Sequence, residues 1–503
     1  MAKRTAIIDI GSNSARLVIF EKSSRFGFHL ICEQKSKVRI GEGAYSKGGY
    51  LQPIGIERAY LALNSFVQTI KKYHVKKVIS VATSALRDAP NGREFVRWIR
   101  QELNLSIKII DGNEEAKLGA IAATNLLPIY DAITIDIGGG SSDIALIRNG
   151  IIAQTYSLDI GTVRIKELFF DGDSSSDSIE KARKYIANEL KKLPSNFRAK
   201  VAVGIGGTAR TISKGILKRH NYPLNKLHAF EYKVQKELLY FNDIICANNS
   251  TLHNLYIKKG RFDTIKEGTL IFEEILKTIE AKNVITSSVG VREGVFLKDL
   301  LRSSQYKFPQ ELNPSLKSIL DRFDDLTSKD SHSSHRIAIA SSLYDIFHQE
   351  FLLSTKYKRE LYTALKLSNI GKTLRIYDAK KHAFYISMQE LNFGFTHKEM
   401  VLISLLLRMD GNSLLHKPLV TEYKPLLPKK EELKFLSFLY TLSMLLHDNS
   451  NSANITFTYA NNTLSIHSDQ SLYHAKENIA LLERPYPFDI IFEDKKSIPN
   501  YTF

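Results

Sequence analysis

Two segments of the chain combine an aspartate, a glycine turn and several hydroxyl groups, a combination that can hold phosphate and a metal ion. Residues 5–20 read TAIIDIGSNSARLVIF and residues 132–147 read AITIDIGGGSSDIALI. In each, a β-branched run ends in Asp-Ile-Gly, a small polar turn follows, and a second apolar run completes an expected β-hairpin. Glycines let backbone N–H groups approach phosphate closely. An aspartate at a strand end can bind Mg²⁺ directly or through water.

The two segments align with each other, which indicates two duplicated lobes. Asp9 matches Asp136, and Gly11 matches Gly138. If the turns face each other, they form a clamp for a phosphate chain, with these aspartates as Mg²⁺ ligands; the alternative is two plain structural hairpins. The candidate phosphate-binding residues are Gly11, Ser12, Asn13, Ser14, Arg16, Gly138, Gly139, Gly140 and Ser141.

The spacing of apolar residues predicts an α/β core followed by a mostly helical region. Strands are expected at 77–82 and 107–110, helices at 56–73, 92–102, 113–124 and 179–193, and a strand–glycine–helix unit at 200–213. A Leu-rich, helix-periodic stretch then extends from 335 to 448, before a short β-like stretch at 453–468. We predict three domains, at 1–126, 127–300 and 301–503.

The charge of the chain bears on its partners. With 70 Lys+Arg against 53 Asp+Glu, the net charge of +17 attracts polyanions such as nucleic acid, nucleotides, polyphosphate or anionic membranes. The alternative is a cytoplasmic protein that is simply basic. No basic–aromatic motif indicates a specific nucleic acid. No apolar run approaches the roughly 18 residues of a membrane span. Cys32 and Cys246 lack metal-type spacing, so we expect a cytoplasmic protein without disulfides or a membrane segment.

The glycine turns belong to a longer series of motifs that resembles one known family. DIGSNS at 9–14 and DIGGGSSD at 136–143 occur with ATSALRDAPN at 82–91, IIDGNEEAKLG at 109–119, GIGGTAR at 204–210 and VGVREGV at 289–295. In order and spacing, this series resembles the Ppx/GppA family (exopolyphosphatase and guanosine pentaphosphate phosphohydrolase) of the acetate kinase–sugar kinase–Hsp70–actin superfamily. The resemblance implies two actin-like (ribonuclease H-like) lobes over residues 1 to about 300.

The resemblance also implies an activity and two catalytic residues. The activity is Mg²⁺-dependent removal of the terminal phosphate from guanosine pentaphosphate (pppGpp to ppGpp, in the stringent response), from inorganic polyphosphate, or from both, and guanosine pentaphosphate is the preferred substrate of this expectation. The catalytic base is assigned to Glu114, the first residue of a Glu-Glu pair that opens a helix. By themselves, acids at a helix start usually compensate the helix dipole. Arg87 is assigned as the arginine that neutralises phosphate, with a surface salt bridge as the alternative.

Three further assignments follow from the same resemblance. Asp143 stands where the family commonly has glutamate near the metal, so it is a candidate Mg²⁺ ligand, directly or through water; Asp136 is preferred. Gly206, Gly207 and Thr208 resemble the turn that contacts nucleoside or distal phosphates, although a glycine needed only for strand-to-helix packing is an equal rival. Arg292 and Glu293 are expected to pair structurally.

The region after residue 300 resembles the HD-type helical domain of longer family members. His335 and His382 lie at matching places, but Ser368 and Asn369 replace the His-Asp pair and bind divalent metals poorly. We therefore expect no metal catalysis there, and a role in widening the basic cleft or in forming a homodimer. Two other functions share the superfold: a small-molecule kinase, which needs an acceptor, and a nucleotide-binding sensor, which needs no water-activating base.

Overall fold

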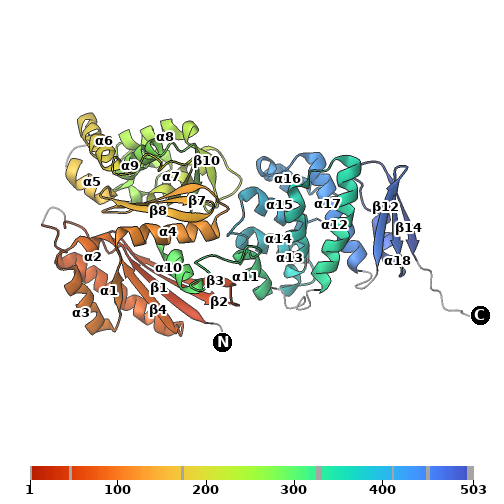
Figure 1. The fold of residues 1–503 in the computed structure, drawn as a ribbon, viewed down its shortest axis with the longest axis horizontal. Helices are drawn as coiled ribbons and strands as arrows, with labels where there is room; N and C mark the ends of the chain where they lie inside the picture. The colour runs from red at the N-terminus through yellow and green to blue at the C-terminus, as the bar shows by residue number, and fades with distance from the viewer. Residues whose placement is uncertain are drawn as a thin grey trace, which may run out of the picture. The chain divides into compact units, whose positions relative to one another are not determined.

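The chain divides into two units, residues 1–314 and 315–503 (Figure 1). The computed structural model describes residues 3–44, 48–170, 175–323, 331–409, 413–448 and 454–494. Residues 301–314 belong to the first unit, whereas the sequence placed the boundary at 301. They are held to α4 (Gly112–Leu126) by Asn125, whose side chain donates to the Tyr306 carbonyl at 2.8 Å and accepts from the Phe308 amide at 3.1 Å.

The first lobe is a five-stranded sheet with helices packed on one face. The strand order is β3-β2-β1-β4-β5; β1 to β3 are antiparallel, and β4 and β5 run parallel to β1. Side chains alternate along β1, so Ala6, Ile8 and Ile10 join the core under α1 and α3 while Asp9 lies on the opposite face. The elements are β1 (Arg4–Ile10), β2 (Ala15–Lys22), β3 (Phe28–Ser36), α1 (Pro53–Lys72), β4 (Lys77–Ala82), α2 (Ser84–Asp88), α3 (Gly92–Leu103) and β5 (Ile107–Ile109).

The second lobe repeats this topology, which confirms the predicted duplication. Its sheet has the order β10-β11-β9-β6-β7-β8, so β8-β7-β6-β9-β11 corresponds to β3-β2-β1-β4-β5 of the first lobe. The elements are β6 (Ala132–Ile137), β7 (Ser142–Arg148), β8 (Ile151–Leu158), α5 (Thr162–Phe169), α6 (Ser176–Leu190), β9 (Val201–Ile205), α7 (Gly206–Arg219), β10 (Glu231–Lys233), α8 (Val234–Cys246), η2 (Leu252–Leu255), η3 (Lys259–Arg261), α9 (Ile265–Thr278) and β11 (Asn283–Thr286).

Two helices lie between the sheets, and their packing fixes the position of the Glu114–Glu115 pair. α4 packs against α10 (Val291–Leu300), and α4 also contacts β7 and β8 while α10 contacts β1 (Figure 1). A β-carbon on Gly294 would lie 2.0 Å from the Leu118 carbonyl oxygen, so only glycine allows this helix contact. The contact sets the rotation of α4, and therefore the direction in which each residue of its first turn points.

The second unit is mostly helical and ends in a small sheet. The strand order is β12-β13-β14, with β12 antiparallel and β14 parallel to β13. Its elements are α11 (Pro314–Phe323), α12 (Ser331–Phe351), η4 (Thr355–Tyr357), α13 (Lys358–Leu367), η5 (Ile370–Thr373), α14 (Ala379–Glu390), α15 (His397–Leu407), α16 (Lys417–Glu422), η6 (Lys424–Leu426), α17 (Lys430–Asp448), β12 (Ile455–Ala460), β13 (Thr463–Ser468), α18 (Tyr473–Ala480) and β14 (Asp489–Asp494).

Two of the residues compared with an HD site, His335 and Ser368, contact other polar groups of this unit. His335 Nδ1 lies 3.0 Å from Nδ1 of His447, and the Ser368 hydroxyl accepts a hydrogen bond from Arg336 at 2.8 Å. His382 lies in α14 and is half-buried. The likeness of this unit to HD domains stays a prediction. No helix in the described ranges has the length and apolar character needed to cross a membrane.

Candidate active site between the two lobes

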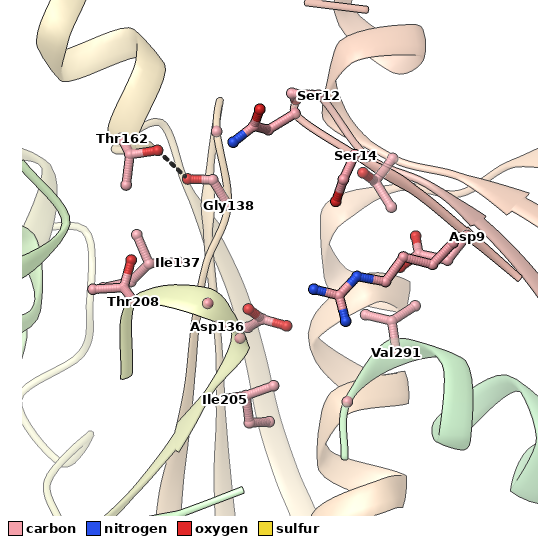
Figure 2. A pocket seen from close by; sticks show the side chains of 18 of the residues that line it. Asp9, Ser12, Ser14, Asp136, Ile137, Gly138, Thr162, Ile205, Thr208 and Val291 are labelled. Carbon is pink, nitrogen blue, oxygen red and sulfur yellow. Dashed lines mark hydrogen bonds between the residues drawn. The ribbon is translucent and has the colours of Figure 1, made fainter. Parts of the chain in front are cut away.

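A cavity of about 180 Å³ lies between the two lobes of unit 1 (Figure 2). The first lobe contributes the turn after β1 and the end of β3, and the second contributes the turns after β6 and β9 together with η3. The start of α10 closes the lining. The predicted residues that line it are Asp9, Gly11, Ser12, Asn13, Ser14, Arg16, Asp136, Gly138, Gly139, Gly206, Gly207 and Thr208.

The two Asp-Ile-Gly turns have the same backbone construction and face each other. The amides of Gly11 and Gly138 each donate to the carbonyl three residues further on, at 3.1 and 2.9 Å. A β-carbon on Gly139 would lie 2.9 Å from the β-carbon of Ser12, so the close approach of the turns needs glycine there. Figure 2 shows Ser12 and Ser14 opposite Gly138. The geometry therefore has the facing turns that a phosphate clamp requires.

Six basic side chains line the cavity, and among them only Arg16 was predicted as a ligand contact. Burial first, and then repulsion by Arg16, lower the pKa of Lys35 to about 8 and that of Arg210 to about 10. Cations held this close repel one another, and a bound polyanion would relieve that repulsion. The six are Arg16, Lys35, Lys37, Arg210, Arg261 and Arg292.

Some of these cations carry a sequence signal. Arg210 lies four residues after Gly206 on α7, so one helical turn returns it to the same face, where its Nε donates to the Gly206 carbonyl at 2.8 Å. Arg292 donates to Glu33 at 2.8 Å, and its distance to Glu293 is 4.0 Å. The expected pairing with Glu293 is therefore the weaker contact, and Arg292 lines the cavity instead.

Four carboxylates lie at or beside the cavity, and burial raises the pKa of each. The pKa of Asp136 rises to about 6, and that of Asp143 to about 7. The pKa of Asp9 is also raised, chiefly by burial. The pKa of Glu115 is raised well above its usual value, first by burial and then by repulsion from Asp143, Asp136 and Asp9. A cation placed among these groups would stabilise their charged forms.

The donor set fits Mg²⁺ better than a metal that needs a cage of protein ligands. Within the described ranges, no three His, Cys, Asp or Glu side chains are grouped to hold one ion. Mg²⁺ is commonly held by one or two carboxylates, with waters and substrate phosphates completing its shell. Asp9 and Asp136 line the cavity. Asp143 accepts from Ser157 at 2.5 Å and from Ser141 at 3.4 Å outside the lining, which suits contact through water.

The Glu-Glu pair divides between two cavities, and only its second residue reaches the interlobe cavity. The Glu114 carboxylate accepts a hydrogen bond from Lys298 and lines a separate cavity. Glu115 lines the interlobe cavity and accepts from Arg87 Nη1 at 3.4 Å. Successive residues on a helix point about 100° apart, so only one of the pair can face the phosphates. The structure thus brings Glu115, not Glu114, to the site.

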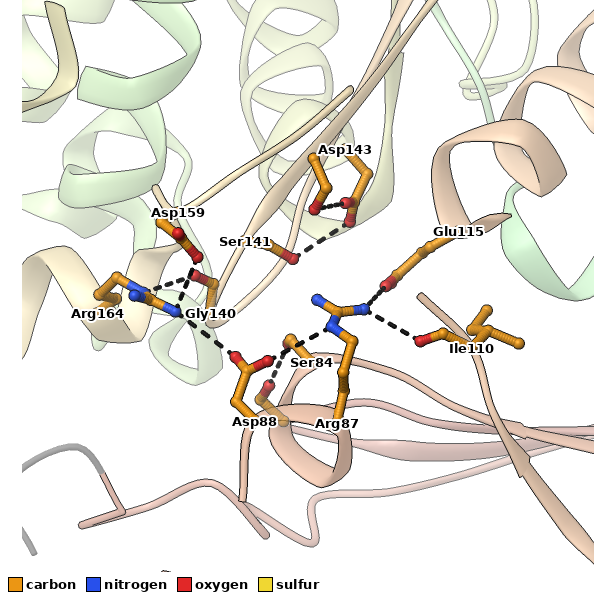
Figure 3. A network of polar contacts seen from close by, with 12 residues as sticks. Ser84, Arg87, Asp88, Ile110, Glu115, Gly140, Ser141, Asp143, Asp159 and Arg164 are labelled. Atoms are coloured by element: carbon orange, nitrogen blue, oxygen red, sulfur yellow. Dashed lines mark hydrogen bonds and ion pairs between the residues drawn. The ribbon is translucent and has the colours of Figure 1, made fainter. Parts of the chain in front are cut away.

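Besides Asp143, three further predicted residues lie behind the lining rather than in it. Arg87 does not line the cavity but contacts Glu115, which does; it donates to the Glu115 carboxylate and, at 3.2 Å, to the Ile110 carbonyl (Figure 3). Gly140 presents its carbonyl to Arg164 at 2.9 Å, and Ser141 is buried against Asp143. These residues support the site without lining it.

The third glycine turn is built around Asp136. Gly206 has a φ of +80°, and a β-carbon there would lie 2.2 Å from Asp136 Oδ1. Glycine is therefore needed both for the backbone conformation and for the approach of the carboxylate. Gly206, Gly207 and Thr208 all line the cavity, so both readings of this turn, ligand contact and packing, have a structural basis.

Comparison with known proteins covers the first unit. Residues 18–303 match the model of the Ppx/GppA phosphatase family. The chain is 31% identical over 310 residues to the bifunctional 3-dehydroquinate synthase/phosphatase of Fusobacterium nucleatum subsp. nucleatum, covering 58% of this chain and 46% of that protein. It is 28% identical over 299 residues to exopolyphosphatase 2 of Mycobacterium tuberculosis, covering 56% of this chain and 92% of that protein. The match thus spans less than half of the fusobacterial protein.

Solved structures agree with these matches. A Ppx/GppA family member from Aquifex aeolicus superposes with a TM-score of 0.52 at 26% identity, over 60% of this chain and 99% of that chain. An exopolyphosphatase from Cytophaga hutchinsonii, at 23% identity, shares the fold with a TM-score of 0.56, over 61% of this chain and 100% of that chain. Because the family model matches more than half of this chain, and because the chain has duplicated actin-like lobes with facing glycine turns, the chain belongs to the Ppx/GppA phosphatase family.

Proposed function

We propose that this protein is a Mg²⁺-dependent phosphohydrolase that removes the terminal phosphate from inorganic polyphosphate, from guanosine pentaphosphate, or from both. The observation that carries the proposal is the composition of the interlobe cavity. Six cations suited to a phosphate chain lie beside buried carboxylates suited to a metal and to a water-activating base. Membership of a phosphatase family supports the reaction class.

We assign the base to Glu115. A water attacks the terminal phosphorus in line with the bridging P–O bond, its proton passes to Glu115, and the bond breaks as the shortened chain leaves with the bond's electrons. A raised pKa suits a base that works near neutral pH. Arg87 orients the Glu115 carboxylate through the 3.4 Å contact. Mg²⁺, held by Asp136 and Asp9 with Asp143 through water, would neutralise charge on the phosphate oxygens.

The glycine turns and the cations hold the phosphate chain. The turns after β1 and β6 offer backbone amides and short hydroxyls, and Arg16, Lys37 and Arg261 are among the cations that line the same cavity. Within the described residues, the lining contains no Phe, Tyr or Trp on which a guanine base could stack. This favours polyphosphate over guanosine pentaphosphate, the reverse of the preference drawn from the sequence. The exopolyphosphatases among the relatives support the same choice.

The test is phosphate release by the full chain offered long-chain polyphosphate, guanosine pentaphosphate and GTP in parallel, with Mg²⁺ and without an acceptor. We expect the greatest kcat/KM with polyphosphate and loss of turnover when the metal is chelated. Phosphate release that requires an added acceptor would indicate the kinase. Binding without phosphate release in the wild type would indicate the sensor. Either result would overturn the proposal.

We assign unit 2 a supporting role in the same function, as an HD-like domain without metal chemistry. Its part is to lengthen the basic binding surface or to join two copies of the chain. Light scattering after size-exclusion chromatography tests the homodimer, for which the expected mass is twice 57.0 kDa. A monomer at assay concentration would leave the binding surface as the role of the unit.

A further inference from the structure

A line of polar contacts crosses from the second lobe to the first beside the cavity (Figure 3). In the second lobe, Arg164 of α5 donates through Nε to the Gly140 carbonyl at 2.9 Å. In the first lobe, Asp88 at the end of α2 faces Arg164 Nη2 at 3.5 Å with one carboxylate oxygen. Its other oxygen lies 3.4 Å from Arg87 Nε. Arg87 in turn contacts Glu115 at 3.4 Å.

Each end of this line is fixed to one lobe. The first turn of α5 is bound to the second glycine turn, because the amides of residues 162 and 163 donate to the carbonyls of Gly138 and Gly139 at 3.0 and 2.9 Å. At the other end, Arg87 donates to the carbonyl of Ile110, which follows β5. When the lobes separate, the link between Arg164 and Asp88 must break, since it joins different lobes.

We propose that Arg164 and Asp88 are positioning residues, which couple closure of the lobes to the orientation of Arg87 and Glu115. This inference rests on the proposed function, because it assigns a role to the closed state in phosphate hydrolysis. In the closed state, Arg164 holds one oxygen of Asp88, and the second oxygen then holds Arg87 with its guanidinium towards Glu115. In an open state, Asp88 lacks its interlobe partner and Arg87 loses one of its restraints. The base is therefore set only when the cleft has closed.

The ordinary alternative is a surface ion pair without effect on the reaction. Arg164 and Asp88 have side-chain exposures of 20% and 36%, and exposed pairs of this kind are worth little by themselves. Two features argue for more than that. One guanidinium holds a glycine-turn carbonyl and the opposite lobe at the same time, and one carboxylate connects two arginines. Asp159 provides an internal control, because it contacts Arg164 at 3.2 Å from within the same lobe.

The kinetic test compares Arg164→Met, Asp88→Asn, the double variant and Asp159→Asn. We expect the two single variants each to lose roughly five- to a hundredfold in kcat, with KM within about twofold, because misorientation of a catalytic group by about 1 Å costs that much. The double variant should lose no more than the worse single variant, since both changes break one link. Arg164→Lys should fall between Met and wild type. Equal losses in Asp159→Asn, or additive losses in the double variant, would overturn the proposal.

A second measurement separates this inference from the proposed function. Spin labels at Leu61 of α1 and Leu239 of α8, both exposed, report the distance between the lobes, with Cys32 and Cys246 replaced first. Long-chain polyphosphate should shorten the distance in wild type and in Asp159→Asn, and shorten it less in Arg164→Met. Unchanged closure in Arg164→Met would overturn the coupling. If wild type closes normally but releases no phosphate, the proposed function fails while the interlobe contact stands.

Discussion

Exchange of Glu115 for glutamine tests the assignment of the base. Glutamine fills the same space as glutamate but cannot take up the proton. A positioned general base contributes about 10²–10⁴-fold, so kcat for phosphate release should fall about a hundredfold or more. KM should change less than about threefold, because the six cations that line the cavity are untouched. Thermal unfolding should show no loss of stability, since the change removes a buried charge repelled by Asp143, Asp136 and Asp9.

Glu114→Gln is the matched control, one residue away on the same helical turn. The carboxylate of Glu114 pairs with Lys298, and the two side chains are 21% and 34% exposed. Such a pair contributes about 0.2–1 kcal/mol, so this variant should lose at most about 1 kcal/mol of stability and less than about threefold in kcat. Both variants are assayed by continuous phosphate release from polyphosphate near neutral pH with Mg²⁺. If Glu114→Gln loses turnover while Glu115→Gln keeps it, the reasoning from helix rotation is refuted.

Three further predictions follow from the same site. Asp143→Asn should raise the melting temperature above about pH 7, because burial raises the pKa of this carboxyl in the folded protein to about 7. The stability that the carboxyl contributes below its unfolded pKa is lost as pH rises through the folded pKa. Calorimetry should find that the difference in melting temperature between variant and wild type disappears below about pH 4 and shrinks with Mg²⁺; a lower melting temperature of the variant at high pH would contradict the prediction. KM for polyphosphate should rise as pH passes about 8, because the Lys35 amine of the enzyme without substrate loses its charge there. Lys35→Arg should make this rise smaller, because arginine keeps its charge. Gly206→Ala should abolish Mg²⁺-dependent turnover because its β-carbon would lie 2.2 Å from Asp136 Oδ1. Gly150→Ala is the control: φ is also positive there, at +68°, but the added β-carbon would meet only Lys307 Nζ, at 3.9 Å. It should cost about 1 kcal/mol in chemical denaturation and leave turnover intact.

The elements that were predicted best are those whose residues specify them locally. The strand expected at 77–82 is β4, Lys77–Ala82, because its β-branched residues Val78, Ile79 and Val81 favour an extended backbone. α1 begins at Pro53, three residues before the expected start at 56, because proline suits the first turn of a helix. β14 was not predicted as a strand. It pairs in parallel with β13 across an intervening helix, and such a partner is not adjacent in sequence.

Site residues whose backbone geometry is set by sequence motifs were predicted, whereas site residues whose position depends on tertiary packing were missed. The glycine turns were found because their backbone geometry needs those residues. Arg261 was missed because η3 belongs to no motif, and its place at the cavity depends on long-range packing. The choice between Glu114 and Glu115 depends on the rotation of α4, which the close contact at Gly294 fixes from α10. No local pattern in residues 109–119 contains that information.

The two hairpins share a framework but present different chemistry at one register position. In the first lobe Asp9 lies opposite Arg16, and in the second Asp136 lies opposite Asp143. Opposed residues of an antiparallel pair share a face of the sheet, so one hairpin presents an acid with a cation and the other presents two acids. Burial raises the pKa of all three acids, but Arg16 counteracts the rise at Asp9, whereas Asp136 adds to it at Asp143. The first hairpin therefore offers phosphate a cation beside one acid, and the second offers a metal ion two acids, so that a duplicated scaffold yields the two unlike halves that the proposed phosphate hydrolysis needs.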